Sequence, residues 1–256
     1  MLSTLPITLQ AGLWGLLGGS ALVLGAAIAY LAALPQRVVA AIMAFGSGVL
    51  ISAVAFDLMD EAYRRGGFDS TALGFISGAV LYTAANVALS RRGARHRKRS
   101  GTEDDSRQAP AGEGGLAIAV GALLDGIPES VVIGVSLLGG TGVSLVTVAA
   151  VFLSNVPEGL SSAAGMRRAG RSASYVFGVW GGIALASGAA ALLGAAMLAG
   201  ANPEIIAATD AVAAGAILAM LADTMIPEAF ETAHEYAGLI TVLGFLAAFV
   251  LTKLEG

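Results

Sequence analysis

The sequence predicts an all-α integral membrane protein with eight transmembrane helices, and two observations lead to this prediction: its composition and the length of its apolar runs. Hydrophobic residues make up 56% of the 256 residues, charged residues only 12%, and the mean hydropathy is +0.80. Soluble domains are about a quarter charged, so this much apolar surface requires lipid around it. The chain has no cysteine, which excludes disulfides and thiolate metal ligands. Its apolar runs have the length of about 20 residues that crosses a bilayer.

All eight runs belong to one expected transmembrane domain over 1–256. Turn-forming sequences fall between them at Pro35, at 139–142 and at Asn202-Pro203. The boundary at 59–70 carries the weakest signal, and its charged residues indicate a short polar connection. The predicted spans are 9–33, 38–59, 70–90, 114–138, 143–165, 173–200, 205–226 and 236–254.

The segment 91–113 is hydrophilic, lacks apolar periodicity and is expected to be a disordered cytoplasmic loop between the third and fourth spans. It holds seven of the 14 basic residues. If it is cytoplasmic, 11 basic residues lie inside and three outside, in agreement with the positive-inside rule. Both termini are then expected outside a cell inner (plasma) membrane. A role of this loop in binding anionic lipid or a partner is the alternative to an orientation signal.

Spans 1–3 and 6–8 have similar local sequences. Trp14 and Trp180 stand in the matching blocks GLWG and GVWG, and 48–63 (GVLISAVAFDLMDEAY) parallels 215–230 (GAILAMLADTMIPEAF). Five crossings separate span 1 from span 6, so the two blocks insert in opposite senses. This predicts an inverted repeat in a 3+2+3 arrangement, a plan common among secondary transporters. Chance similarity between apolar helices is the alternative.

Two spans carry a Pro-Glu pair near their middle, Pro128-Glu129 and Pro157-Glu158. Asp125 lies four residues before Glu129, and Ser154 lies four residues before Glu158, a spacing that places each pair on one helical face. Carboxylates at this depth are costly, so protons or a cation are expected to offset their repulsion. The alternative is a pair of packing kinks with buried, protonated acids.

Each proline also leaves one carbonyl of its helix without an amide donor, at Leu124 and at Leu153. The oxygen ligands available are then carboxylate, amide, hydroxyl and carbonyl groups. This set suits Mg²⁺ or Mn²⁺ and can also hold Fe²⁺ or Zn²⁺. The candidate metal ligands are Asp125, Glu129, Ser154, Asn155 and Glu158.

The two motifs resemble those of the ZIP (Zrt/Irt-like) family of divalent metal transporters, as a bacterial or archaeal-type member with a divergent metal site. In that family span 4 typically reads His-Asn-x-Pro-Glu, and span 5 reads His or Gln, then Glu or Asp, then x-Pro-Glu-Gly. The resemblance covers the whole chain, with eight spans, outside termini and a variable loop between spans 3 and 4. It implies a primary site of Asp125, Glu129, Ser154 and Glu158.

The family's second site implies Gly126, Asn155, Glu158 and an acid from span 6. Here Gly126 offers no side chain, Asn155 replaces an acid, and span 6 has no acid. Asp125 stands where the family has histidine. The resemblance therefore implies one oxygen-rich site and no intact second one.

The resemblance also implies pathway roles for Asp57 near the outer end of span 2 and Asp223 at the inner end of span 7, although both could be ordinary acids at the interface. Glu228, Glu231, His234 and Glu235 are expected to form a solvated cytoplasmic connection, with a role in receiving departing cations as the alternative.

The expected function is transport of a divalent cation (Zn, Mn, Fe or similar) towards the cytoplasm, past Asp57, through the site and out past Asp223. No enzymatic activity and no cofactor are expected, since the metal is the substrate. A non-transporting metal sensor or scaffold, an intramembrane metallo-hydrolase and a proton-coupled carrier of another solute are the alternatives. The expected partners are the metal ion and the lipid bilayer, without nucleic acid, and a homodimer is an allowed assembly.

Overall fold

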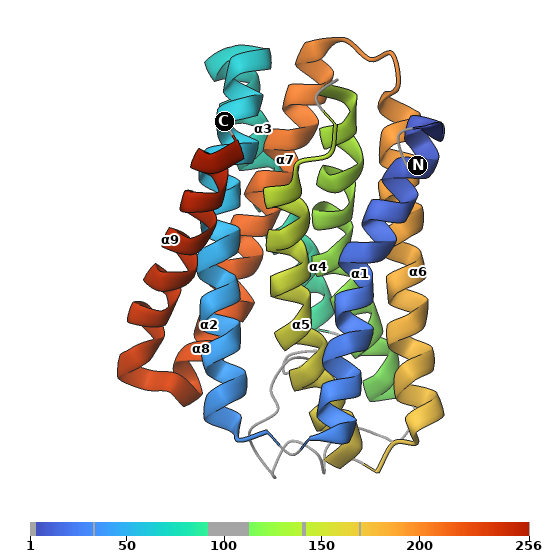
Figure 1. Cartoon of the computed structure of the whole chain (residues 1–256), viewed down its shortest axis with the longest axis vertical. Coiled ribbons are helices and arrows are strands. Elements are labelled where there is room, and N and C mark those ends of the chain that lie inside the picture. The colour runs from blue at the N-terminus through green and yellow to red at the C-terminus, as the bar shows by residue number, and fades with distance from the viewer. Residues whose placement is uncertain (1–3, 33, 92–112, 140–141, 169, 256) are drawn as a thin grey trace.

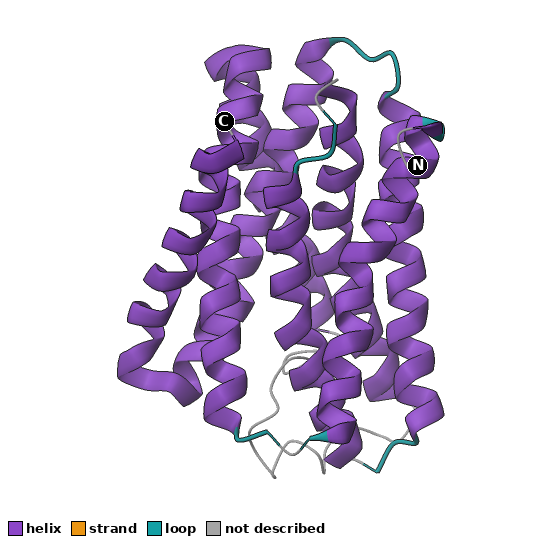
Figure 2. Cartoon of the chain, in the orientation of Figure 1, coloured by secondary structure: helices purple, strands orange, loops and turns teal. Residues whose placement is uncertain are grey.

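The chain folds into a bundle of long helices, and the part that is described contains no strand (Figure 2). A computed structural model describes residues 4–32, 34–91, 113–139, 142–168 and 170–255. Nearly all of 91–113, the segment expected to be a disordered loop, lies outside these residues. Six helical segments within them are long and apolar enough to cross a membrane. The protein is therefore a multi-pass membrane protein.

The helices alternate in direction between the two ends of the bundle (Figure 1). Their order along the chain is α1 (Ile7–Leu31), α2 (Gln36–Ala53), α3 (Met59–Leu89), α4 (Glu113–Ser136), α5 (Leu145–Arg168), α6 (Ala173–Leu198), α7 (Pro203–Met220), α8 (Ile226–Ala233) and α9 (Ala237–Glu255). Both chain termini lie at one end of the bundle, which we name the terminal end. The other is the opposite end.

Helix starts follow the turn chemistry of the sequence. Ser172 caps α6 by accepting a hydrogen bond from the Tyr175 amide, and Asn202 caps α7 in the same way, with Pro203 as its first residue. The predicted connection at 59–70 is instead largely helical. It is broken only at Gly67, whose φ of 71° and ψ of −176° are non-helical. A residue with a side chain rarely adopts this positive φ, which explains glycine at the break.

Two π-helical turns occur at matching places in the chain. They cover Val54–Leu58, between α2 and α3, and Leu221–Met225, between α7 and α8. Each begins six residues after a glycine, Gly48 or Gly215. Insertions of this kind are rare and occur frequently at functional sites. Asp57 lies on the first π-helical turn and Asp223 on the second.

The helices pack as two groups. The first bundle consists of α1, α4, α5 and α6, and the second bundle of α2, α3, α7, α8 and α9, in which the α2–α9 pair meets the α3–α7 pair through the π-helical turns and a shared apolar core. The most extensive contacts are α1 with α5 and α6 in the first bundle, and α3 with α7 and α2 with α9 in the second. Between the bundles, α2 meets α5 and α4 meets α7. In Figure 1, α2 and α9 lie at one side and α1 and α6 at the other.

Glycines allow the closest helix contacts inside each bundle. A Cβ on Gly48 of α2 would overlap the Thr241 carbonyl of α9, and a Cβ on Gly25 of α1 would overlap the Val156 carbonyl of α5. Small residues allow membrane helices to pack backbone against backbone in this way. Between the bundles, a Cβ on Gly46 of α2 would lie 3.2 Å from the Leu153 carbonyl of α5, a tight contact without the overlap found at the glycines inside each bundle.

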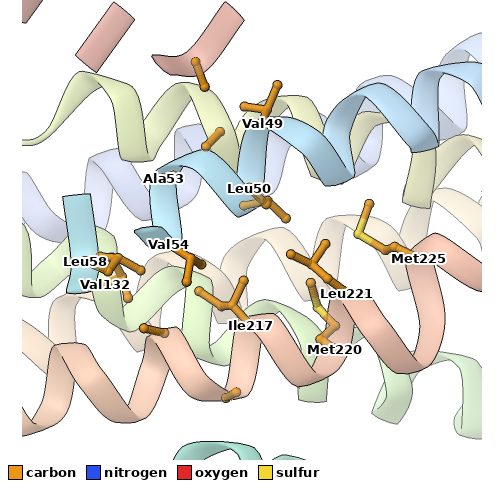
Figure 3. Packing of buried hydrophobic residues seen from close by; sticks show 14 of the residues in the cluster. Val49, Leu50, Ala53, Val54, Leu58, Val132, Ile217, Met220, Leu221 and Met225 are labelled. Atoms are coloured by element: carbon orange, nitrogen blue, oxygen red, sulfur yellow. The ribbon is translucent and has the colours of Figure 1, made fainter. Parts of the chain in front are cut away.

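The largest apolar core lies mainly within the second bundle (Figure 3). Leu50 and Val54 from α2 and its π-helical turn pack with Ile217 and Leu221, and Val132 of α4 joins them from the first bundle. A second core inside the first bundle surrounds the fully buried Trp180. The polar residues predicted from the sequence lie on α4 and α5, beside the first of these cores.

Candidate metal site between α4 and α5

The two Pro-Glu pairs lie inside continuous helices, Pro128 in α4 and Pro157 in α5. The three acids near them are all buried: Asp125 is 1% exposed, Glu129 2% and Glu158 8%. Ser154 and Asn155 are buried as well. Buried carboxylates need partners that compensate for lost hydration. The structure thus gives each predicted ligand the burial of an internal site.

Hydroxyl groups supply partners for two of the acids. The Ser154 hydroxyl of α5 shares its proton between the Val151 carbonyl of its own helix at 2.9 Å and Glu129 Oε1 of α4 at 3.3 Å, and the second contact joins the two helices at the site. The Tyr82 hydroxyl of α3 donates to Asp125 Oδ1 at 2.6 Å. Asp125 therefore contacts the second bundle, whereas Glu129 contacts its neighbour within the first.

Asn155 turns towards α1, where its side-chain Nδ2 donates to the Gly18 carbonyl at 3.1 Å. This contact fixes the amide group against a backbone. Among the described residues, no three Asp, Glu or His side chains gather into a group that could hold a metal ion. The donor set around Glu129 thus combines carboxylate with hydroxyl oxygen, and any cation there would compete with the hydrogen bonds from Ser154 and Tyr82.

The carbonyl freed by Pro157 belongs to Leu153, and it lies against Gly46 of α2. The absence of a side chain at Gly46 lets α2 approach this proline-altered turn of α5. This carbonyl therefore lies at the boundary between the bundles, where a backbone group without an amide donor is tolerated if it lines a polar space.

Glu158 lines a small cavity on the side of the site towards the opposite end. Ser161 and Ser162 follow Glu158 on α5, and Glu228 of α8 faces them from the second bundle. The Ser161 hydroxyl donates to Glu228 Oε1 at 3.0 Å. The cavity is lined by Met43, Glu158, Ser161, Ser162, Met225 and Glu228.

One sequence expectation is corrected here. Glu228 was expected to lie in a solvated connection together with Glu231, His234 and Glu235. Those three residues are exposed, but Glu228 is half-buried and bonded to α5. Glu228 differs from the other three because it lies in the first turn of α8, a helix that packs against α2, whereas the other three follow that first turn.

Asp57 lies near the terminal end, apart from the hydrogen-bonded groups around Glu129. Its carboxylate accepts hydrogen bonds from Ser144 at 3.2 Å and Thr147 at 3.3 Å, both at the start of α5, and from Thr252 of α9 at 3.5 Å. Ser144 also caps α5 by accepting from the Thr147 amide. Asp57 thus connects the two bundles. Asp223 is exposed on its π-helical turn.

Sequence reasoning missed Tyr82, Ser161, Ser162 and Asp210. Ser162 continues the four-residue spacing of Ser154 and Glu158, and this signal was available in the sequence. Tyr82 and Asp210 gave no such signal, because their partners are distant in the chain. Asp210 of α7 is buried and lies 3.9 Å from the Arg65 guanidinium, which also binds Glu61 at 2.6 Å.

Among models of known protein families and among curated proteins, none matches this chain.

Proposed function

We propose that this protein carries divalent metal cations across the cell membrane towards the cytoplasm, through the site between α4 and α5. The observation that carries the proposal is the burial of Asp125, Glu129 and Glu158 in the middle of two proline-containing membrane helices. Acids inside membrane segments are rare, costly and usually functional. Carboxylates with hydroxyl and carbonyl oxygens are ligands for divalent cations. The ZIP-like motifs around them support the same cargo.

Eight crossings in a 3+2+3 inverted repeat are part of this proposal. The segments Gln36–Leu89 and Pro203–Leu254 contain 54 and 52 residues. Straight helices of that length would reach roughly 80 Å, far beyond the hydrocarbon core of about 30 Å. A fold-back at Gly67 in the first and at His234–Tyr236 in the second gives eight crossings.

Symmetric details support the inverted repeat. Both π-helical turns follow their glycine by the same six residues. The helix contacts are reciprocal as well. Gly48 of α2 packs on Thr241 of α9, and Gly244 of α9 packs on Phe45 of α2. In the same way, Gly215 of α7 packs on Phe75 of α3, and Gly78 of α3 packs on Val212 of α7. Such repeats give one chain two related conformations, one open to each side of the membrane.

The contacts between the bundles suit relative movement. Inside each bundle, backbones pack directly on one another at glycines. Between the bundles, hydroxyl–carboxylate bonds occur at three levels: Asp57 with Ser144 and Thr147, Tyr82 with Asp125, and Ser161 with Glu228. Such bonds can be exchanged without unpacking a core. Rigid bundles that rock against each other would expose the site to either side.

The membrane potential supplies a driving force in this proposal. An inside-negative potential favours inward movement of a doubly charged cation by about 4–5 kcal/mol per 100 mV. With both termini outside, the terminal end faces the exterior, and the cation enters near Asp57. It leaves at the opposite end, past Glu158 and towards Asp223.

The test is uptake of Zn²⁺, Mn²⁺, Fe²⁺ and Co²⁺ into proteoliposomes that contain the full chain. We expect Glu129→Gln to reduce initial uptake at least tenfold, because the amide keeps the shape of the side chain and removes its charge. Ser130→Ala is the matched control, since within the described residues the Ser130 hydroxyl bonds to the Gly126 carbonyl of its own helix and to no other group. If wild type transports all four ions no faster than Glu129→Gln, the transport proposal is wrong.

A metal sensor or scaffold that binds without transporting is the second candidate. It is favoured by the hydrogen bonds that already engage Asp125 and Glu129 and hold the two carboxylates in place. Stoichiometric metal binding without flux in the same vesicles would support this candidate. Activity as a metallo-hydrolase has no such supporting observation.

A further inference from the structure

We propose that the cavity between α5 and α8 is a second cation site, shared between the two bundles and adjacent to the site at Glu129, with which it has Glu158 in common. Its carboxylate ligands would be Glu158 of the first bundle and Glu228 of the second. This inference rests on the proposed function, because it places a further binding position for the same cargo on the path from Glu129 towards the opposite end.

The first support is the enclosure of the two acids around one small space. Glu158 and Glu228 both line the cavity, and they come from helices of different bundles. Two carboxylates that line one small space in a membrane interior repel one another unless a proton or a cation offsets their charge. A divalent cation would balance both charges at once.

The second support is Ser162, whose hydroxyl makes no hydrogen bond within the described part of the chain. Ser162 is 7% exposed and lines the cavity beside Glu158. Buried hydroxyl groups nearly always have a partner, which is a protein group, a water or an ion. A hydroxyl oxygen that lines the same cavity as two carboxylates is a suitable third ligand for a cation. Ser161 holds Glu228 in position by donating to its Oε1 at 3.0 Å.

The remaining lining residues indicate which cations the site would favour. Met43 and Met225 are almost fully buried, and both reach the cavity from the second bundle. Thioether sulfur is a soft ligand, whereas Mg²⁺, Ca²⁺ and Mn²⁺ prefer oxygen alone. The mixed set of carboxylate, hydroxyl and thioether groups therefore favours Zn²⁺ over Mn²⁺ at this position. The oxygen-rich site at Glu129 would discriminate less between Zn²⁺ and Mn²⁺.

A cation bound here would also join the bundles. Glu158 moves with the first bundle and Glu228 with the second, so the ion would be held fully only while both lie against the cavity. Separation of the bundles at this end would divide the ligand set and weaken binding. The site would thus bind a cation before its release at the opposite end.

The experiment is equilibrium binding of radioactive Zn²⁺ to the detergent-solubilised full chain, with the number of bound ions per chain as the result. We expect about two for wild type, one for Glu228→Gln, one for Glu129→Gln and two for Glu235→Gln, the exposed control near α8. If Glu228→Gln binds as many ions as Glu235→Gln, the second site is refuted.

Two milder variants cover the case in which Glu228→Gln does not fold. Ser162→Ala should weaken binding of the second Zn²⁺ roughly tenfold, a loss of about 1.4 kcal/mol in binding free energy. Met225→Leu should weaken Zn²⁺ binding but leave Mn²⁺ binding unchanged. A loss of packing alone would affect the binding of both ions. If wild type binds one Zn²⁺ and only Glu129→Gln loses it, water fills the cavity. The proposal of a second site would then be wrong, while the transport proposal stands. No Zn²⁺ in wild type would contradict both proposals.

Discussion

At the residue scale, the site is stabilised by hydroxyl donors that come from other helices. Asp125 accepts from Tyr82, and Glu129 accepts from Ser154. Both carboxyl groups are almost fully buried, so the loss of a donor leaves an acceptor that water cannot readily satisfy. The Tyr82–Asp125 bond also crosses between the bundles, which makes Tyr82 a candidate positioning residue for Asp125.

We therefore predict that Tyr82→Phe lowers the unfolding free energy in detergent by about 1 kcal/mol and slows metal uptake. Tyr63→Phe is the matched control, because Tyr63 is exposed on the same helix. Thermal unfolding and vesicle uptake measure the two effects. Equal stability and equal uptake in Tyr82→Phe, Tyr63→Phe and wild type would show that the bond to Asp125 contributes nothing.

At the element scale, glycine determines which helices pack most closely. Gly78 of α3 lies against the Val212 carbonyl of α7, and Gly215 of α7 lies against the Phe75 carbonyl of α3. A methyl group at either position would overlap the facing backbone. The sequence shows 35 glycines, but it does not show which of them face another helix.

We predict that Gly78→Ala and Gly215→Ala each destabilise the protein by about 1–3 kcal/mol, because α3 and α7 must move apart. Gly178→Ala and Gly182→Ala on α6 are the controls, since a Cβ at either position would meet nothing within 4 Å. These controls should unfold at the wild-type temperature or above it, because alanine favours helix more than glycine does. Similar losses in all four variants would argue against close packing between α3 and α7.

At the scale of the whole molecule, the segregation of charge predicts orientation. Eleven basic residues fall on one proposed side and three on the other, so the terminal end should face outward. The protein lacks cysteine, so single cysteines can report which side each connection occupies without background labelling.

We predict that Ala199→Cys, between α6 and α7, reacts with a membrane-impermeant maleimide applied to intact cells. Ala173→Cys, at the start of α6, should react only after the membrane is permeabilised. Both residues are exposed, so a difference between them reports the side of the membrane and not burial. The reverse pattern would show that the terminal end faces the cytoplasm and that the proposed direction of transport is wrong.

Several features of the molecule could be read from the sequence because they depend on local patterns. Apolar runs of about 20 residues, interrupted by proline and glycine, are enough to predict a multi-pass bundle of long apolar helices, since a membrane interior requires satisfied backbone groups. The positions of Asp125, Glu129, Ser154 and Glu158 on the faces of two helices follow from helical spacing alone. The similarity of 48–63 and 215–230 is likewise visible in one dimension.

Tertiary structure alone decided which of these groups meet. Glu228 belongs to a connection rich in charge, yet packing of α8 against α2 half-buries it and brings it to Ser161, 67 residues away in the chain. Tyr82 is 43 residues from Asp125, and Asp57 is 195 residues from Thr252. Side chains this far apart carry no shared periodicity. Their contacts arise from helix packing, which depends on the whole set of glycine and apolar contacts at once.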